Sequence, residues 1–419
     1  MTALLFLFMV VNFADKTVLQ LCAVPIMEEL KLSYEQFGAL GSSFFVLFAV
    51  SAIAVGFVAN RIPSKWALLA MAVVWSLVQF PMVGMVSFEI LLACRIILGA
   101  GEGPAAPIAT HAAYKWFPDS IRALPTAIIT QGAALGVIVA VPALNYIIIN
   151  HSWHWAFVAL GVVGLLWAAV WLVFGREGTL VDAPIAAGTS EEHVPYRHLL
   201  ACPTFLAVCF AGFASYWGIA LGLTWFTAYL RLGLGYSQQV GGNLSTLPWL
   251  FGFVVLLAGG ILSQRLRTRG VSSRACRGIV GAAPMIVGGC SLLFLSVMPT
   301  PGAKVALLVF GTAIGSTIYI VVPMIVSELT PHGQRAAVLS ISTAIVTLSG
   351  AFAPFVMGWV IQHAATPLQG YELSFTILGI LLVAGGIVGL LFIRPEADRK
   401  RLAAHAIAAS SINARPARA

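Results

Sequence analysis

Apolar runs of about 20 residues or more recur along the whole chain and constrain its fold more than any other feature. Each run is long enough to cross a hydrocarbon core about 30 Å thick. In lipid, backbone polar groups need partners within the protein, and these runs lack the alternating pattern of barrel strands. We therefore predict an all-α membrane protein with twelve membrane-spanning helices, at residues 2–22, 36–58, 66–86, 88–112, 122–148, 153–175, 203–230, 240–263, 277–298, 303–327, 335–362 and 371–393.

The composition excludes a water-soluble domain. Hydrophobic residues make up 60% of the 419, and charged residues make up 9%. A soluble domain carries about 25% charged residues, so this chain has too few to cover a water-facing surface. The six cysteines form no CxxC pair, and we interpret them as small apolar residues. We expect no metal and no cofactor.

The first apolar run is predicted to be an uncleaved span. It lacks the basic leader and the small-residue cleavage site of a signal peptide, and it carries Asp15 and Lys16. Because it begins almost at Met1, a longer native N-terminus is left open.

Basic residues are distributed unevenly between the predicted loops. Of the 23 lysines and arginines, eighteen lie on one side, together with both chain ends. The other side carries only Lys31, Arg231 and Lys304. The positive-inside rule places the basic side, and both termini, in the cytoplasm. The net charge of +8 therefore reflects topology, and we expect no nucleic-acid partner.

Short loop motifs repeat about half a chain length apart. Residues 56–61 (GFVANR) are echoed by 260–265 (GILSQR), and residues 117–122 (FPDSIR) by 330–335 (TPHGQR). Such repeats are typical of transporters built from two parallel halves. We predict two pseudo-symmetric six-helix halves, 1–175 and 201–393, a cytoplasmic linker at 176–200, and a basic tail at 394–419 that touches anionic lipid.

Four ionisable residues lie deep within predicted spans: Asp15, Lys16, Arg95 and Glu102. A charge near the bilayer centre costs at least ~2.5–3.5 kcal/mol on insertion scales, so four in one half indicate a polar cavity or mutual pairing. We expect no comparable charge in the second half.

Helical spacing narrows the contacts that these charges can make. Arg95 and Glu102 are seven residues apart and share a helix face, about 10 Å apart along the axis. Asp15 and Lys16 are adjacent and diverge by about 100°, so contacts between spans, Asp15 to Arg95 or Lys16 to Glu102, are favoured. The four residues either only pair to hold two spans together, or the cations receive a substrate carboxylate while the two acids exchange protons.

Several motifs around these residues resemble the anion:cation symporter branch of the major facilitator superfamily. Residues 12–16 (NFADK) resemble its first-span N-Y-x-D-R, and residues 95–103 (RIILGAGEG) resemble its fourth-span R-x-x-x-G-x-G-E-G. Residues 116–122 (WFPDSIR), 152–157 (SWHWAF), and 223–226 (LTWF) with Tyr229 are similar to further motifs of that branch. The resemblance covers essentially the whole chain.

This resemblance implies proton-driven or sodium-driven uptake of organic anions by alternating access. It assigns cation coupling to Asp15 and Glu102, and anion binding to Lys16 and Arg95. It also places Trp225 near the substrate. It marks five loop positions as gating residues: Gly56, Asn60, Arg61, Arg122 and Arg265. Asn60 stands where the superfamily has an acidic residue, which puts the gating salt bridge there in doubt.

Departures from the family pattern make the expected pocket less polar. Lys16 replaces an arginine, so a two-pronged contact to carboxylate becomes a point charge. Phe13, Phe48, Ala52 and Ala133 stand where sugar-acid members have Tyr, Tyr, Gln and Gln. Unpaired sugar hydroxyls would cost about 1–3 kcal/mol each, so an aromatic or weakly polar acid is favoured over a sugar acid. Gln131 remains a candidate polar contact.

We therefore expect a secondary transporter rather than an enzyme, since no catalytic motif is present. The leading prediction is a proton-coupled symporter of a small organic carboxylate, monomeric, in a bacterial inner membrane. A sugar-acid symporter, and an exchanger or exporter of the same fold, are the alternatives.

Overall fold

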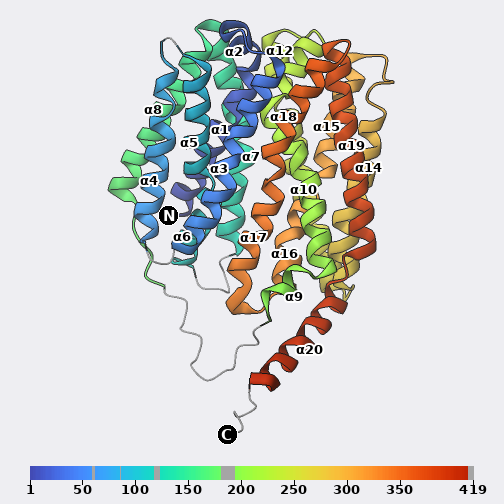
Figure 1. Cartoon of the computed structure of the whole chain (residues 1–419). Helices are drawn as coiled ribbons and strands as arrows, with labels where there is room; N and C mark the ends of the chain where they lie inside the picture. Colours follow the sequence, from blue (N-terminus) through green and yellow to red (C-terminus); the bar gives the residue numbers. More distant parts are fainter. Residues whose placement is uncertain (59–61, 85, 118–122, 181–193, 414–419) are drawn as a thin grey trace.

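The computed structural model describes residues 1–58, 62–84, 86–117, 123–180 and 194–413. Twelve helical spans in these residues are long and apolar enough to cross a membrane, as predicted. Figure 1 shows the blue-to-green helices of the first six spans on one side of the bundle and the yellow-green-to-red helices of the last six on the other.

The first six spans are built from helices of 20 residues or more and from pairs of shorter ones. Short helices cover the turn after the first span (α2, Ala23–Leu30) and end the third (η1, Phe80–Met82). The spans themselves are α1 (Thr2–Leu21), α3 (Tyr34–Val58), α4 (Ser64–Leu77) with η1, α5 (Phe88–Glu102) with α6 (Ala105–Tyr114), α7 (Ala123–Asn150) and α8 (Trp153–Phe174).

The last six spans follow the short helix α9 (Tyr196–Leu200) and precede the C-terminal helix α20 (Pro395–Asn413). The seventh span ends at Thr224, earlier than predicted, where the chain turns through α11 (Phe226–Ala228) and the π-helical η2 (Tyr229–Gly233). The spans are α10 (Pro203–Thr224), α12 (Gln238–Leu244) with α13 (Leu247–Thr268), η3 (Arg274–Ile279) with α14 (Val280–Leu293), α15 (Pro301–Gly315) with α16 (Ile318–Leu329), η4 (His332–Gln334) leading into α17 (Arg335–Thr347) with α18 (Ser349–His363), and α19 (Pro367–Phe392).

The two ends of the bundle differ. Helices α9 and α20 lie at one end, which we call the linker end; α2 and α12 lie at the other, the α2/α12 end (Figure 1). Helix α1 packs extensively on α7, and α14 packs extensively on α19. The contact of α3 with α18 joins the two halves.

Hydrogen bonds join the halves at the α2/α12 end. Gln238 of α12 donates to the Leu21 carbonyl at the end of α1 (3.2 Å) and to the side chain of Asn145 on α7 (2.9 Å). Between α18 and α3, the Phe355 N–H donates to Ser42 Oγ (3.0 Å). The structure is therefore closed between the halves at this end.

Candidate functional site

Two glycines bring the fourth span against the second. A side chain on Gly99 would overlap the Phe44 carbonyl, and one on Gly103 would overlap the Phe48 carbonyl and the Ser51 hydroxyl. The two glycines are four residues apart, so they lie on one face of the span and allow α5 to lie close against α3. This close approach places the rings of α3 beside the charged residues of α5.

The ion pair of Lys16 and Glu102 lies inside this packing. Lys16 Nζ is 3.1 Å from Glu102 Oε2, and both side chains are buried. Lys16 also donates to Asn12 Oδ1, one helical turn earlier on α1. The predicted contact between the first and fourth spans is thus confirmed for Lys16 and Glu102.

Asp15 points elsewhere, as the divergence of adjacent residues predicts. Its Oδ1 accepts a hydrogen bond from Gln79 Nε2 of the third span (3.1 Å), and its Oδ2 has no partner within the described ranges. The expected alternative, an Asp15 contact to Arg95, is not formed as an ion pair in this part of the chain. Gln79 was missed by sequence reasoning, although an amide inside an apolar span is a usable signal.

Arg95 is buried and only partly compensated. Its exposed fraction is 4%, and its Nε and Nη1 have no hydrogen-bond partner among the described residues. Its guanidinium carbon lies 4.9 Å from the ring centroid of Phe44. A cation–π contact offsets part of the desolvation cost of a buried cation, but it satisfies none of the in-plane donors. Phe44 is a second contact that sequence reasoning missed.

The two phenylalanines predicted to contact substrate, Phe13 and Phe48, both lie beside Lys16. Lys16 Nζ is 4.5 Å from the Phe13 ring centroid and 5.4 Å from that of Phe48. Phe48 in turn packs on Phe44, with ring centroids 5.4 Å apart. The cationic groups of Lys16 and Arg95 therefore lie beside one group of rings, Phe13, Phe44 and Phe48, which we call the aromatic lining.

Three other predicted substrate contacts lie outside this cluster. Gln131 and Ala133 are half-buried on α7, beside Gly132, which packs against the Phe6 carbonyl of α1. Trp225 is fully buried, and its Nε1 donates to the Pro354 carbonyl (2.9 Å). Trp225 thus packs α10 against α18, and its contact with substrate stays a prediction, as do those of Gln131 and Ala133.

Most of the predicted gating residues lie outside the part of the chain that the structure describes. Asn60, Arg61 and Arg122 fall outside the described residues, and Gly56 lies in the last turns of α3. Arg265 is exposed in the last turn of α13. Their gating role stays a prediction.

The second half carries a buried ion pair that was not predicted, and it lies near the starts of two helices rather than deep within a span. Glu372 is 8% exposed in the first turns of α19 and forms an ion pair with Lys304 in the first turn of α15. Sequence reasoning had placed Lys304 in a loop and had not considered Glu372. Both residues lie in the first turns of helices that pack against neighbours. Their ion pair lowers the cost of placing a charge at the start of a membrane span.

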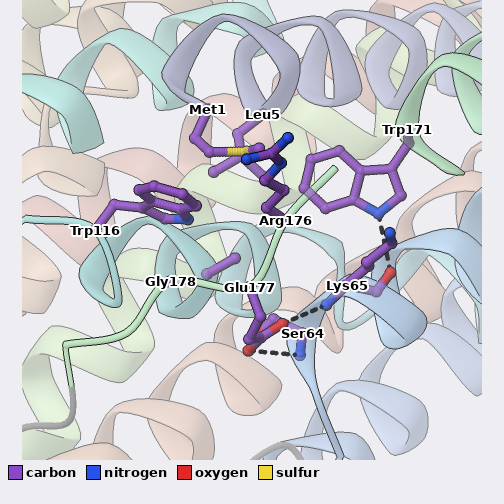
Figure 2. Close-up of a pocket in the computed structure, with 10 residues that line it drawn as sticks. Met1, Leu5, Ser64, Lys65, Trp116, Trp171, Arg176, Glu177 and Gly178 are labelled. Carbon is purple, nitrogen blue, oxygen red and sulfur yellow. Dashed lines mark hydrogen bonds between the residues drawn. The ribbon is translucent and has the colours of Figure 1, made fainter. Parts of the chain in front are cut away.

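A second polar cluster lies at the linker end of the first half (Figure 2). Glu177 Oε1 accepts from the Ser64 N–H (3.0 Å), and Oε2 accepts from the Lys65 N–H (2.8 Å). The carboxylate thereby caps the N-terminus of α4, where the helix leaves unpaired N–H groups. Lys115, just after α6, pairs with the same carboxylate. Glu177 thus ties the ends of the third, fourth and sixth spans together.

The charge of Glu177 is stabilised by these donors. Partial burial acts to raise the pKa of the carboxyl, but the Lys115 ammonium and the N–H groups of Lys65 and Ser64 outweigh it and lower the pKa. The capping contact is therefore present above this lowered pKa and is lost as the pH falls through it. Its partners could not be read from the sequence, since Glu177 follows them by more than 60 residues.

Three similar proteins are named as transporters. The chain is 30% identical over 410 residues to the hexuronate transporter of Bacillus subtilis, covering 94% of each protein. It is 27% identical over 410 residues to a probable sulfoacetate transporter of Cupriavidus necator (92% of this chain, 91% of the relative). It is 26% identical over 422 residues to a probable L-galactonate transporter of Escherichia coli (96% and 90%). Each is named for an organic anion, as the motif resemblance leads one to expect.

Solved structures of low sequence identity share the fold. A bacterial homologue of the human lysosomal transporter Spinster, inward-facing and unoccupied, superposes with a TM-score of 0.77 at 19% identity, over 94% of this chain and 96% of that one. A D-xylose–proton symporter gives a TM-score of 0.74 at 18% identity, over 94% and 97%. The family model of the Major Facilitator Superfamily matches residues 5–324. The chain is an integral membrane protein and belongs to the Major Facilitator Superfamily.

Proposed function

We propose that the chain is a proton-coupled symporter that takes up a small organic carboxylate by alternating access. It works as a monomer in a bacterial inner membrane, with both termini in the cytoplasm. The relatives named for hexuronate, sulfoacetate and L-galactonate support an organic anion as substrate. The buried charges of the first half support an ionic site within the membrane.

The unpaired donors of the buried Arg95 side chain are the observation that carries the proposal. A buried guanidinium with two nitrogens that lack a partner is costly unless an anion compensates it. Lys16 lies on the same aromatic lining and brings a second cation. A carboxylate bound between them satisfies the free donors of Arg95 and competes with Glu102 for Lys16.

Competition for Lys16 couples substrate to protons. Lys16 pairs with Glu102 in this structure, and the ammonium supplies the counter-charge of the buried carboxylate. When an entering anion draws Lys16 away, Glu102 is left buried and charged, a state that protonation relieves. Asp15, which accepts a hydrogen bond from Gln79 of the third span, is the second proton carrier in this scheme.

The closed α2/α12 end suggests which step of the cycle the structure represents. The hydrogen bonds of Gln238 and Ser42 hold the halves together at that end. With the linker end in the cytoplasm, this is a state closed to the outside. Substrate can enter from the outside only after these hydrogen bonds break. A bound anion drives closure only if its affinity differs between the outward-facing and inward-facing states.

The substrate class follows from the lining. Phe13, Phe44 and Phe48 surround the two cations and offer rings rather than hydroxyl or amide groups. This lining favours an aromatic or weakly polar acid. A sugar acid is the second candidate, and the similarity to a hexuronate transporter specifically favours it.

Current after proton-gradient activation in proteoliposomes tests the proposal, with a panel of aromatic, short aliphatic and sugar acids. A pH-dependent current or radiolabelled uptake with at least one class is expected. A signal confined to sugar acids would keep the mechanism and overturn the aromatic preference. Absence of carboxylate uptake with and without a gradient would contradict the proposal, and gradient-independent exchange alone would replace symport by exchange.

A further inference from the structure

Two tyrosines of the second half lie against each other within the bundle. Tyr216 of α10 and Tyr319 of α16 have nearly parallel rings with centroids 5.9 Å apart. The Tyr319 hydroxyl is buried and has no hydrogen-bond partner among the described residues. The same holds for the hydroxyl of Ser215, the residue before Tyr216 in the sequence. A buried hydroxyl without a partner is unfavourable, so it marks a position where a ligand group can bind.

Ring contacts connect the tyrosine pair with the charged residues of the first half. Phe45 of α3 packs edge-on against Tyr216, with centroids 5.8 Å apart, and it also contacts Phe48 at 6.1 Å. Phe48 is the ring that lies beside Lys16 Nζ. A run of ring contacts, Phe48 to Phe45 to Tyr216 to Tyr319, therefore leads from Lys16 to the two tyrosines of the second half.

The chemistry of the two sides is complementary. Lys16 and Arg95 are donors suited to a carboxylate, whereas a phenol both donates and accepts one neutral hydrogen bond. The phenylalanine rings between them suit an apolar or ring-shaped body. A molecule that satisfies all three parts has a carboxylate at one end and a hydroxyl group at the other.

We propose that Tyr319, supported by Tyr216, is the second-half contact of the transported anion, and that the preferred substrates carry a hydroxyl group remote from the carboxylate. This inference rests on the proposed function and narrows its substrate class. It joins the aromatic lining to the hydroxyl-bearing acids for which relatives are named. Because the contact comes from the half opposite to Arg95, such a substrate touches both halves, which is what ligand-driven closure requires.

Matched acids that differ in one hydroxyl test this subsite. Uptake of 3-phenylpropionate is compared with that of 3-(4-hydroxyphenyl)propionate, and uptake of hexanoate with that of 6-hydroxyhexanoate, with glucuronate as a hydroxyl-rich acid. In the wild type, the hydroxylated member of at least one pair should have a lower KM. Tyr319→Phe should raise that KM by about tenfold, equivalent to about 1.4 kcal/mol, and leave the matched acid within about twofold. Tyr216→Phe should act in the same direction with about a threefold effect.

Two control variants separate this inference from the proposed function. Tyr229→Phe removes another buried, unpartnered hydroxyl, one that lies among Tyr371 and Phe375, and it should change neither member of a pair. Arg95→Ala should weaken both members of each pair. Tyr216→Phe keeps the test available if Tyr319→Phe does not fold. Equal effects on both members, or no effect, would overturn the subsite and leave the carboxylate site standing. Failure of the wild type to take up any of these acids would overturn both proposals.

Discussion

The two halves of this transporter place their charged residues differently. In the first half, Asp15, Lys16, Arg95 and Glu102 are buried within two spans, and Lys16 and Glu102 form an ion pair between them. In the second half, the buried pair of Lys304 and Glu372 lies at the beginnings of two helices. A charge at a helix start can be reached from the membrane surface, whereas one deep in a span needs a partner or a ligand. We therefore expect the pair of the second half to hold helices together, and the cluster of the first half to bind substrate and protons.

Removal of Arg95 should have the largest effect. Arg95→Ala should lower anion affinity by about 100-fold or more, because truncating one partner of a buried charge pair costs about 2–5 kcal/mol. Arg95→Lys should retain part of the binding, since it keeps the charge without the planar fork. Binding is measured by ligand-induced quenching of tryptophan fluorescence, with the exposed Arg269→Ala as control. Wild-type affinity in Arg95→Ala would exclude Arg95 from the anion site.

Substitution of Glu102 should separate transport from the proton gradient. Glu102→Gln keeps the shape but cannot exchange a proton, so gradient-driven accumulation should fall to near the equilibrium level while exchange stays within about threefold. Uptake with and without a pH gradient, and counterflow, measure the two activities. Accumulation that persists in this variant would show that another group carries the proton.

The pair in the second half should matter for stability and not for coupling. Glu372→Gln leaves Lys304 without its counter-charge, and breaking a buried pair costs about 3–5 kcal/mol when burial is complete. The pair is about one-tenth exposed, so we expect a smaller loss, seen as a lower melting temperature in detergent. The pH dependence of uptake should be unchanged. If Glu372→Gln folds normally and loses proton coupling, the contrast between the halves fails.

Local patterns predicted much of this protein correctly. The twelve spans follow from apolar length, and the contact between Lys16 and Glu102 follows from helical spacing and the cost of unpaired charge in lipid. The ion pair of Glu372 with Lys304 was not predicted, because both residues lie at the edges of predicted spans and were not compared with each other. Gln79, Phe44 and Tyr216 were missed because neutral polar and aromatic residues are common in spans and carry no signal until their neighbours are known.

Hydropathy and charge in the sequence determined that this chain is a helical membrane protein with ionisable residues buried in its first half. Those properties depend on single segments, since each span satisfies its own backbone in lipid. The tertiary structure alone decided which groups meet: Lys16 with Glu102, Asp15 with Gln79, and Arg95 with an aromatic ring in place of a carboxylate. These contacts depend on how closely the helices approach each other. For α5 and α3, which carry Arg95 and its aromatic ring, backbone contacts at Gly99 and Gly103 set the distance between the helices.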